Sequence, residues 1–246
     1  MTRTVLKWIL PALALLTTPL LAQTDDPNRI GSFKPFYVEY TVGNNLINAG
    51  IATLSLQAGD GEWVYSLKTE PAGIFRLTGK GRINEVSVLS VTQDKELIPH
   101  SYSFSQAGDE KRRNVEADFN WEAQELTIRH RGEEATEELT DPILDRLSVT
   151  LTVMDLVREG FERADLQILD GGKIKAMSFI NEGRQTVDTA LGSFDTIVVR
   201  RIREGSSRET VTWFAPELDY VPVMIEQLKR GELVARLKIR KLREGG

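Results

Sequence analysis

The sequence contains no cysteine and only two histidines, His100 and His130, among 246 residues. The lack of cysteine excludes disulfides, thiolate nucleophiles, iron–sulfur clusters and cysteine zinc sites. Two histidines are too few for a multi-histidine centre, so we expect no metal site. The apolar run that begins at Trp8 is shorter than the roughly 20 apolar residues of a membrane-spanning helix and is broken by Pro11 and Pro19.

The N-terminal segment places Arg3 and Lys7 around the start of a short apolar run that Pro11 interrupts. This pattern predicts a secretory signal peptide over residues 1–22, cleaved near Ala22, with transport through the general pathway and a periplasmic location. An uncleaved anchor is the alternative. Because no cysteine follows the cleavage point, we expect no lipid anchor. We also expect no membrane-spanning segment after cleavage, because the apolar run is too short for a span and is removed with the signal peptide. Residues 23–34 are predicted to be a flexible leader.

The net charge of the chain argues against partners that are strongly anionic. The formal net charge is −5, and removal of residues 1–22 takes away two basic residues and no acid, which gives −7. Such an acidic protein has no overall attraction for nucleic acid or anionic lipid, so we expect no nucleic-acid partner. Protein partners cannot be read from the sequence.

Period-two alternation of apolar and polar residues runs through most of the chain and predicts β-strands. The alternation is clearest at the end, where Leu233, Ala235, Leu237 and Ile239 share a face. The predicted strands are 36–42, 49–56, 62–69, 75–81, 85–92, 101–106, 113–121, 125–131, 166–169, 173–180, 186–191, 197–203, 209–214, 221–228 and 233–241.

One segment follows a helical period instead. Spacings of four, four and three place four apolar residues on one face: Ile143, Leu147, Leu151 and Met154. Asp141 suits the N-cap, Pro142 the first helical position and Gly160 the stop, so we predict a helix over about 142–159.

These elements predict a mainly β protein with a large curved antiparallel sheet, an open barrel or a sandwich, and one apolar helix against the apolar wall of the sheet. We expect a single domain over residues 35–243. Two β lobes joined at 133–160 are the alternative, because glutamates cluster at 133–138.

No residue pattern identifies a catalytic site. Ser193 lies in a turn and not in a Gly-x-Ser-x-Gly elbow, and Gly79-Lys80-Gly81 lacks the third glycine of a dinucleotide loop, so we expect no such cofactor. A glycosidase needs only two carboxylates across a groove. Several lie in or beside predicted strands, without a spacing that selects a pair: Glu39, Glu70, Glu85, Glu116 and Asp118.

Two basic patches have two interpretations. Arg112-Arg113 and the Arg200-Arg201-Arg203 group can protect strand edges through ion pairs, or can bind an anionic ligand such as a lipid or glycan head group. Aromatic residues at strand positions are expected in the core, and a subset can line a ligand cavity. They are Tyr37, Trp63, Tyr65, Tyr102, Trp121, Trp213 and Tyr220.

Short motifs add a family resemblance. An early aromatic strand ends in a spaced motif that begins with Tyr40 and closes with Ala49-Gly50, and Asp145-Arg146-Leu147-Ser148 opens the predicted helix. Leu191-Gly192-Ser193-Phe194 precedes a strand. Near the C-terminus, Trp213-Phe214-Ala215-Pro216 is followed by Tyr220-Val221-Pro222-Val223. Over about residues 35–242 the chain resembles the exported Gram-negative proteins catalogued as domain of unknown function three-one-zero-eight. The resemblance implies a periplasmic β-rich fold and no established activity, cofactor or catalytic residue.

We therefore expect a non-enzymatic binding protein of the cell envelope, whose ligand is hydrophobic or anionic: an acyl chain, a lipid or an envelope polymer. Its ligand-binding residues are unknown at this stage. One alternative is a carboxylate-based hydrolase of envelope glycans. Another is a structural or assembly partner that uses an exposed sheet edge.

Overall fold

The computed structural model describes residues 33–59, 61–73, 82–92, 96–108, 113–139 and 142–244. The predicted signal peptide, most of the leader, the predicted strand at 75–81, Arg112 and the predicted N-cap Asp141 lie outside the described residues. None of the helices in the described ranges is long and apolar enough to cross a membrane.

Fifteen strands form one sheet. Their bounds are β1 Phe36–Gly43, β2 Asn48–Ala58, β3 Trp63–Pro71, β4 Ile83–Val91, β5 Leu97–Gln106, β6 Val115–Asn120, β7 Glu125–His130, β8 Glu133–Glu138, β9 Ile143–Asp145, β10 Arg163–Leu169, β11 Ile174–Thr189, β12 Gly192–Ile202, β13 Arg208–Ala215, β14 Val221–Lys229 and β15 Glu232–Glu244. The helical elements among the described residues are α2, Val149–Glu159, and the short 3-10 helix η2, Pro216–Leu218.

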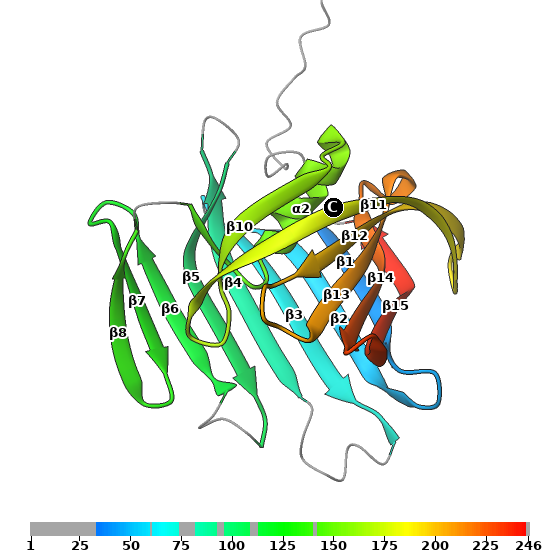
Figure 1. Cartoon of the computed structure of the whole chain (residues 1–246), viewed down its shortest axis with the longest axis horizontal. Coiled ribbons are helices and arrows are strands. Elements are labelled where there is room, and N and C mark those ends of the chain that lie inside the picture. Colours follow the sequence, from blue (N-terminus) through cyan, green and yellow to red (C-terminus); the bar gives the residue numbers. More distant parts are fainter. Residues whose placement is uncertain are drawn as a thin grey trace, which may run out of the picture.

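The strand order shows how the sheet folds over. It runs from β8 down to β1, continues through β15 and ends at β9, so the sheet has two edges and is not closed into a barrel. Figure 1 shows β1 to β8 as one layer, with β10 and β11 crossing in front of it. Neighbouring strands are antiparallel except for β9 and β10, which are parallel. The prediction of a large curved sheet with one helix is confirmed.

The core lies between the two layers. Along β1 the buried residues alternate as Phe36, Val38 and Tyr40, and in β6 as Val115, Ala117 and Phe119. Since side chains on a strand alternate between faces, each of these two strands gives one row to the interior and one towards solvent. The Tyr40 hydroxyl donates to the Pro222 carbonyl at 2.8 Å, which ties β1 to β14 across the curve.

Helix α2 lies between the layers at one end of the folded sheet (Figure 1). It buries five side chains, namely Val149, Leu151, Val153, Met154 and Val157. It ends at Gly160, whose φ of 77° is the left-handed conformation that glycine adopts at low cost. The predicted packing and C-terminus are therefore correct.

The predicted start of the helix is wrong. Residues 143–145 form strand β9, parallel to β10, and the helix begins only at Val149. Ile143 and Leu147 are buried as predicted, but from a strand and a turn. A short apolar run does not distinguish a buried strand from a helix by its period.

Two other strand predictions need correction. The segments 173–180 and 186–191 belong to one 16-residue strand, β11, because the chain passes Gly183 as a bulge against β12 instead of turning. The Glu133–Glu138 run forms an additional strand, β8, with all six residues exposed at a sheet edge.

Candidate functional site

A group of polar side chains lies inside the fold, between the two layers. Four of its members are almost inaccessible: Glu85 retains 2% exposure, and Ser87, Asp145 and Ser148 retain none. Buried polar groups are costly unless they are hydrogen-bonded. We call this group the central polar cluster, defined by Glu85, Ser87, Tyr102, Asp145, Arg146 and Ser148.

An ion pair holds the cluster together. The Arg146 guanidinium binds the Glu85 carboxylate through two nitrogens, with Nε to Oε1 at 2.9 Å and Nη2 to Oε2 at 2.5 Å. Tyr102 donates its hydroxyl to Glu85 Oε1 at 2.7 Å, and the Arg146 guanidinium lies 4.4 Å from the Phe104 ring centre. Burial by itself lowers the pKa of Arg146, but the electrostatic interactions with Glu85, Tyr102 and Asp170 and the hydrogen bond to Glu85 together outweigh that effect, and the pKa is raised. Two-point pairs of this kind combine strength with fixed geometry.

Asp145 organises the turn between β9 and α2. Its Oδ1 accepts the backbone N–H groups of Leu147 and Ser148, both at 2.8 Å, and its Oδ2 accepts the Ser87 hydroxyl at 2.6 Å. Burial raises the pKa of the Asp145 carboxyl, and these hydrogen bonds oppose the rise. Strand β9 lies at an edge of the sheet and is not paired with β4 or β5 through backbone hydrogen bonds. The Asp145-Arg146 pair therefore connects β9 to these two strands through side chains.

A second group faces the cluster from the opposite layer. Lys175 pairs with Asp170 at 2.8 Å, and Arg201 Nη2 donates to Thr210 Oγ1 at 2.8 Å. Burial lowers the pKa of Arg201, and the neighbouring charge of Arg146 lowers it further, against the attraction of Asp170 and Glu85. Thr210 Oγ1 is the one hydrogen-bond acceptor of Arg201 within the described ranges. A guanidinium carries five N–H donors, so most of those of Arg201 are unused there.

A further polar atom in this interior has no partner. The Tyr65 hydroxyl is fully buried and makes no hydrogen bond with any described residue. Burial raises the pKa of Tyr65, with smaller contributions from Tyr40, Glu85 and Asp145. As far as the described residues go, the interior therefore holds both unused donors of Arg201 and the unpaired hydroxyl of Tyr65.

Arg200 and Arg201, which belong to one of the two predicted basic patches, lie on opposite faces of β12. Arg200 lies on the opposite face from Arg201 and pairs with Glu182 at 2.5 Å and Glu209 at 2.7 Å, as expected for protection of a strand surface. Arg203 and Arg113 are exposed. Of the arginines in this set that the structure describes, Arg201 alone lies beside the central polar cluster.

The other residues considered from the sequence do not gather at one place. His100 Nε2 lies 2.8 Å from Ser90 Oγ, and His130 Nδ1 lies 2.8 Å from the Asn114 carbonyl. Among the described residues no group of three or more histidines or acids is arranged to hold a metal ion. Ser193 donates to Asp188 in an exposed turn.

Of the five candidate carboxylates, only Glu85 belongs to the cluster. Glu39 lies within ion-pair distance of Lys241, at 3.5 Å, and Asp118 pairs with Arg129 at 2.6 Å. Glu70 and Glu116 are exposed. The structure therefore does not bring these carboxylates together across a groove.

The aromatic residues have different environments. Tyr65 and Tyr102 are buried in the interior, and Trp213 is buried with its indole N–H on Gln185 Oε1 at 2.9 Å. Trp63 and Trp121 are partly buried against the core. The Tyr37 ring lies 5.9 Å from the Arg243 guanidinium.

The Trp213–Val223 motif supports the helix. Asp219 and Tyr220 follow η2 with φ values of 53° and 62°, a conformation that costs free energy for residues other than glycine. Arg158 of α2 pairs with Asp219 at 2.9 Å, and its guanidinium lies 4.9 Å from the Tyr220 ring centre. The motif thus anchors the C-terminal end of α2.

Two surface clefts are lined by described residues. One, of about 300 Å³, lies beside the β1–β2 loop and includes Ile47, Ala190, Arg236 and Lys238 in its lining. The other, of about 210 Å³, lies beside α2 and includes Phe33, Met154 and Asp219. Neither has a member of the central polar cluster in its lining.

Sequence reasoning missed the central polar cluster as a unit. It named Glu85 as a carboxylate, Asp145-Arg146-Leu147-Ser148 as a motif and Arg201 as part of a patch. Glu85 and Arg146 are 61 positions apart, and nothing in a single sequence indicates that they form an ion pair. On the strand face of Glu85 in β4, Ile83 is apolar but Ser87 is polar, so the alternation along the strand did not mark Glu85 as a buried charge.

Comparison with solved structures supports the fold. The chain is similar to a β-barrel-like protein of the domain of unknown function DUF1849 from Brucella abortus, with 9% identity, coverage of 86% of this chain and 98% of that chain, and a TM-score of 0.55. It also matches an exported-protein candidate with a YmcC-like fold from Bacteroides fragilis, with 11% identity, 85% and 94% coverage and a TM-score of 0.32. A lipoprotein candidate from Parabacteroides distasonis matches with 11% identity, 86% and 96% coverage and a TM-score of 0.31.

Comparison with curated proteins gives no match. Residues 37–238 match a family model, which covers most of the chain and includes β1 to β14, the central polar cluster and Arg201. The motifs quoted from the sequence fall within these bounds. The chain belongs to the family described as protein of unknown function DUF3108.

Proposed function

We propose that this protein is exported to the cell envelope, where it binds a molecule with an anionic group, and that Arg201 holds that group inside the folded sheet. The observation that carries the proposal is the position of the Arg201 guanidinium in the interior. Within the described ranges it donates one hydrogen bond, to Thr210 Oγ1. Arginine is well suited to phosphate and carboxylate groups because its donors form a planar fork.

The surrounding charges support an anion at this place. The Glu85 carboxylate is engaged by Arg146 and Tyr102, and Asp170 is engaged by Lys175. The side chain of Arg146 retains 32% exposure, so a ligand from solvent can approach this side of the cluster. A bound anion would stabilise the partly buried charge of Arg201, whose pKa burial lowers.

The N-terminal segment supports export. Arg3 and Lys7 followed by a short, interrupted apolar run fit a cleaved signal peptide better than a membrane span. A periplasmic or envelope ligand is therefore the relevant class: an amphiphile with a phosphate or carboxylate head, or an anionic polymer.

The two alternatives receive less support from the geometry. Glu85 and Asp145 are the two carboxylates of the cluster, but their exposures of 2% and 0% and their hydrogen bonds leave neither free to meet a glycan. The exposed edge strand β8 carries four glutamates, which disfavour pairing with another strand.

A matched pair of variants tests the proposal. We expect Arg201→Gln to weaken binding of decanoate or decyl phosphate by about tenfold or more, since a hydrogen bond to a charged group is lost. Arg200→Gln should leave binding unchanged, because Arg200 is paired on the opposite face of the same strand. Isothermal titration of both variants measures this.

The choice of probes separates head group from tail. Inorganic phosphate tests the anionic group alone, and decanol tests the apolar chain without charge. Binding of decanol as strong as that of decanoate would contradict the role of Arg201, as would equal losses in the two variants.

A further inference from the structure

Exposed apolar side chains gather at one corner of the molecule. Within the described ranges the exposed large hydrophobic residues are Leu46 at 89%, Ile47 at 49%, Val234 at 48%, Leu191 at 42% and Ile51 at 38%. Single exposed apolar residues are ordinary, but a contiguous group marks a contact surface.

Strand register and the larger cleft place these residues together. Ile51 lies opposite Thr41, and Thr41 lies opposite Lys238 on the other side of β1. The cleft beside the β1–β2 loop joins Ile47, Ala190 and Lys238, so the β11–β12 turn, where Leu191 follows Ala190, reaches the same place. Val234 lies two residues before Arg236 on β15 and so shares its face. We call these five residues the apolar corner.

The β1–β2 loop is built to present Leu46. Asn44 Oδ1 accepts the backbone N–H groups of Leu46 at 2.9 Å and Ile47 at 3.0 Å, and the Asn44 N–H donates to the Ile47 carbonyl at 3.0 Å. Arg236 Nη1 donates to Asn45 Oδ1 at 3.0 Å, which fixes the loop to β15. The loop is thus held by hydrogen bonds while its largest apolar side chain faces water.

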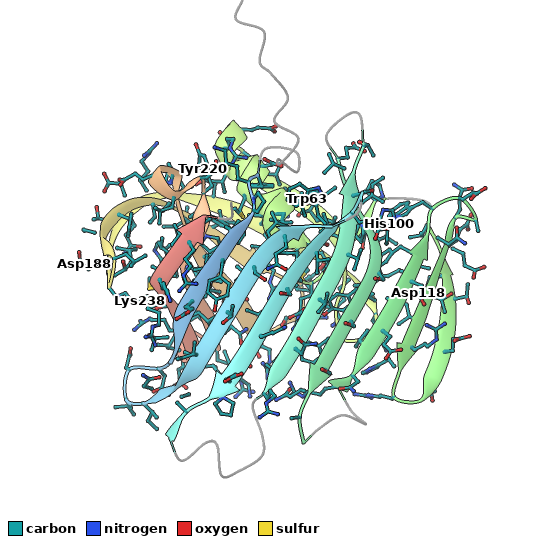
Figure 2. All side chains as sticks on the ribbon, turned by 180° about the vertical axis from the view of Figure 1, so that it is seen from behind. Trp63, His100, Asp118, Asp188, Tyr220 and Lys238 are labelled. Atoms are coloured by element: carbon teal, nitrogen blue, oxygen red, sulfur yellow. The ribbon has the colours of Figure 1, made fainter. Side chains whose placement is uncertain are left out.

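Positive charge accompanies the apolar corner. β15 contains five basic residues in a chain whose net charge is −5, and two of them, Arg236 and Lys238, line the cleft beside the apolar corner, whereas Arg240, Lys241 and Arg243 lie further along the strand. Arg236 pairs with Glu226, and Lys241 lies 3.5 Å from Glu39. Lys238 makes no ion pair with a described residue, and Figure 2 shows it on the same side of the molecule as Asp188 of β11.

We propose that the apolar corner docks on an anionic lipid bilayer, with Leu46 entering the interfacial region and Lys238 facing the lipid phosphates. Apolar side chains beside basic ones are the combination that binds such surfaces, since burial and attraction to anionic lipid add together. The corner is separate from Arg201, so docking does not depend on the proposed ligand site.

A single label tests the docking directly. Because the chain contains no cysteine, Leu46→Cys carries an environment-sensitive dye at one position only. The full chain, purified with its own N-terminal segment, is mixed with phosphatidylcholine vesicles with or without phosphatidylglycerol. We expect a blue shift of the dye with the anionic vesicles. The matched control, Ala123→Cys in the exposed β6–β7 turn, should show no shift, and it carries the same N-terminal segment.

Charge reversal provides the second measurement. Lys238→Glu should weaken binding to the anionic vesicles about fivefold or more, since each basic residue near such a surface contributes about 1 kcal/mol. Lys68→Glu, at an exposed position on β3, should leave it unchanged. Equal dye shifts at positions 46 and 123, or equal effects of the two charge reversals, would overturn the proposal. So would a shift without vesicles that follows dimer formation by light scattering, which would assign the corner to a second copy of the chain.

Discussion

Arg146→Met is expected to destabilise the protein by about 3–5 kcal/mol, the usual effect of removing one partner from a buried ion pair. The loss comes from Glu85, which would remain buried at 2% exposure with Tyr102 as its remaining side-chain partner in the cluster. The turn after β9 would also lose its ion pair with β4, while the hydrogen bond from Ser87 of β4 to Asp145 of β9 would remain. Urea unfolding followed by tryptophan fluorescence measures the change in the free energy of unfolding.

Two controls separate this effect from general loss of charge. Arg201→Met removes another interior guanidinium, but one whose charge is poorly compensated, so we expect a change near zero or a small gain in stability. The double variant Glu85→Gln with Arg146→Met should recover much of the lost stability, because no buried charge is then left alone. A loss below about 1 kcal/mol for Arg146→Met would show that the ion pair does not hold β9, since that is the usual size of surface effects.

The second large effect is expected in α2. Leu151 is fully buried between the layers, so Leu151→Ala should cost about 2–5 kcal/mol through lost burial and the cavity left behind. Leu156 is the matched control, because it lies on the same helix, is partly exposed and is not packed against the core. Leu156→Ala should stay within about 0.5 kcal/mol, as surface substitutions do.

The same denaturation measurement distinguishes a packed helix from a mobile lid. If α2 closes the end of the fold only loosely, Leu151→Ala and Leu156→Ala would give similar, small losses. The contacts of Arg158 with Asp219 and Tyr220 argue for a fixed position, because they hold the C-terminal end of the helix to the turn after η2.

The fold was largely predictable because it rests on local pattern. Alternating burial in β1 and β6 follows from alternating side-chain character, and the helix ends where Gly160 adopts a positive φ. The errors occur where local pattern is ambiguous. Ile143 and Leu147 fit a helical spacing although β9 is a strand, and Glu133–Glu138 carries no apolar alternation because an edge strand without a covering layer needs none.

The candidate site was less predictable because it depends on contacts between distant segments. Arg200 and Arg201 look equivalent in the sequence, but adjacent residues on a strand point to opposite faces. The structure shows that one is paired at the surface and the other lies beside Arg146. Likewise, Asp145-Arg146 was recognisable as a motif, but its partners Glu85 and Ser87 come from β4.

Native mass spectrometry of the protein purified from the compartment that it reaches tests the central claim most directly. If Arg201 holds an anionic envelope molecule, the wild-type protein and Arg200→Gln should carry the same additional mass, and Arg201→Gln should have lost it. Dissociation of that mass in the gas phase would identify a phosphate-bearing or carboxylate-bearing compound. A wild-type spectrum without added mass, together with no binding of decanoate or decyl phosphate to the purified protein, would contradict the account.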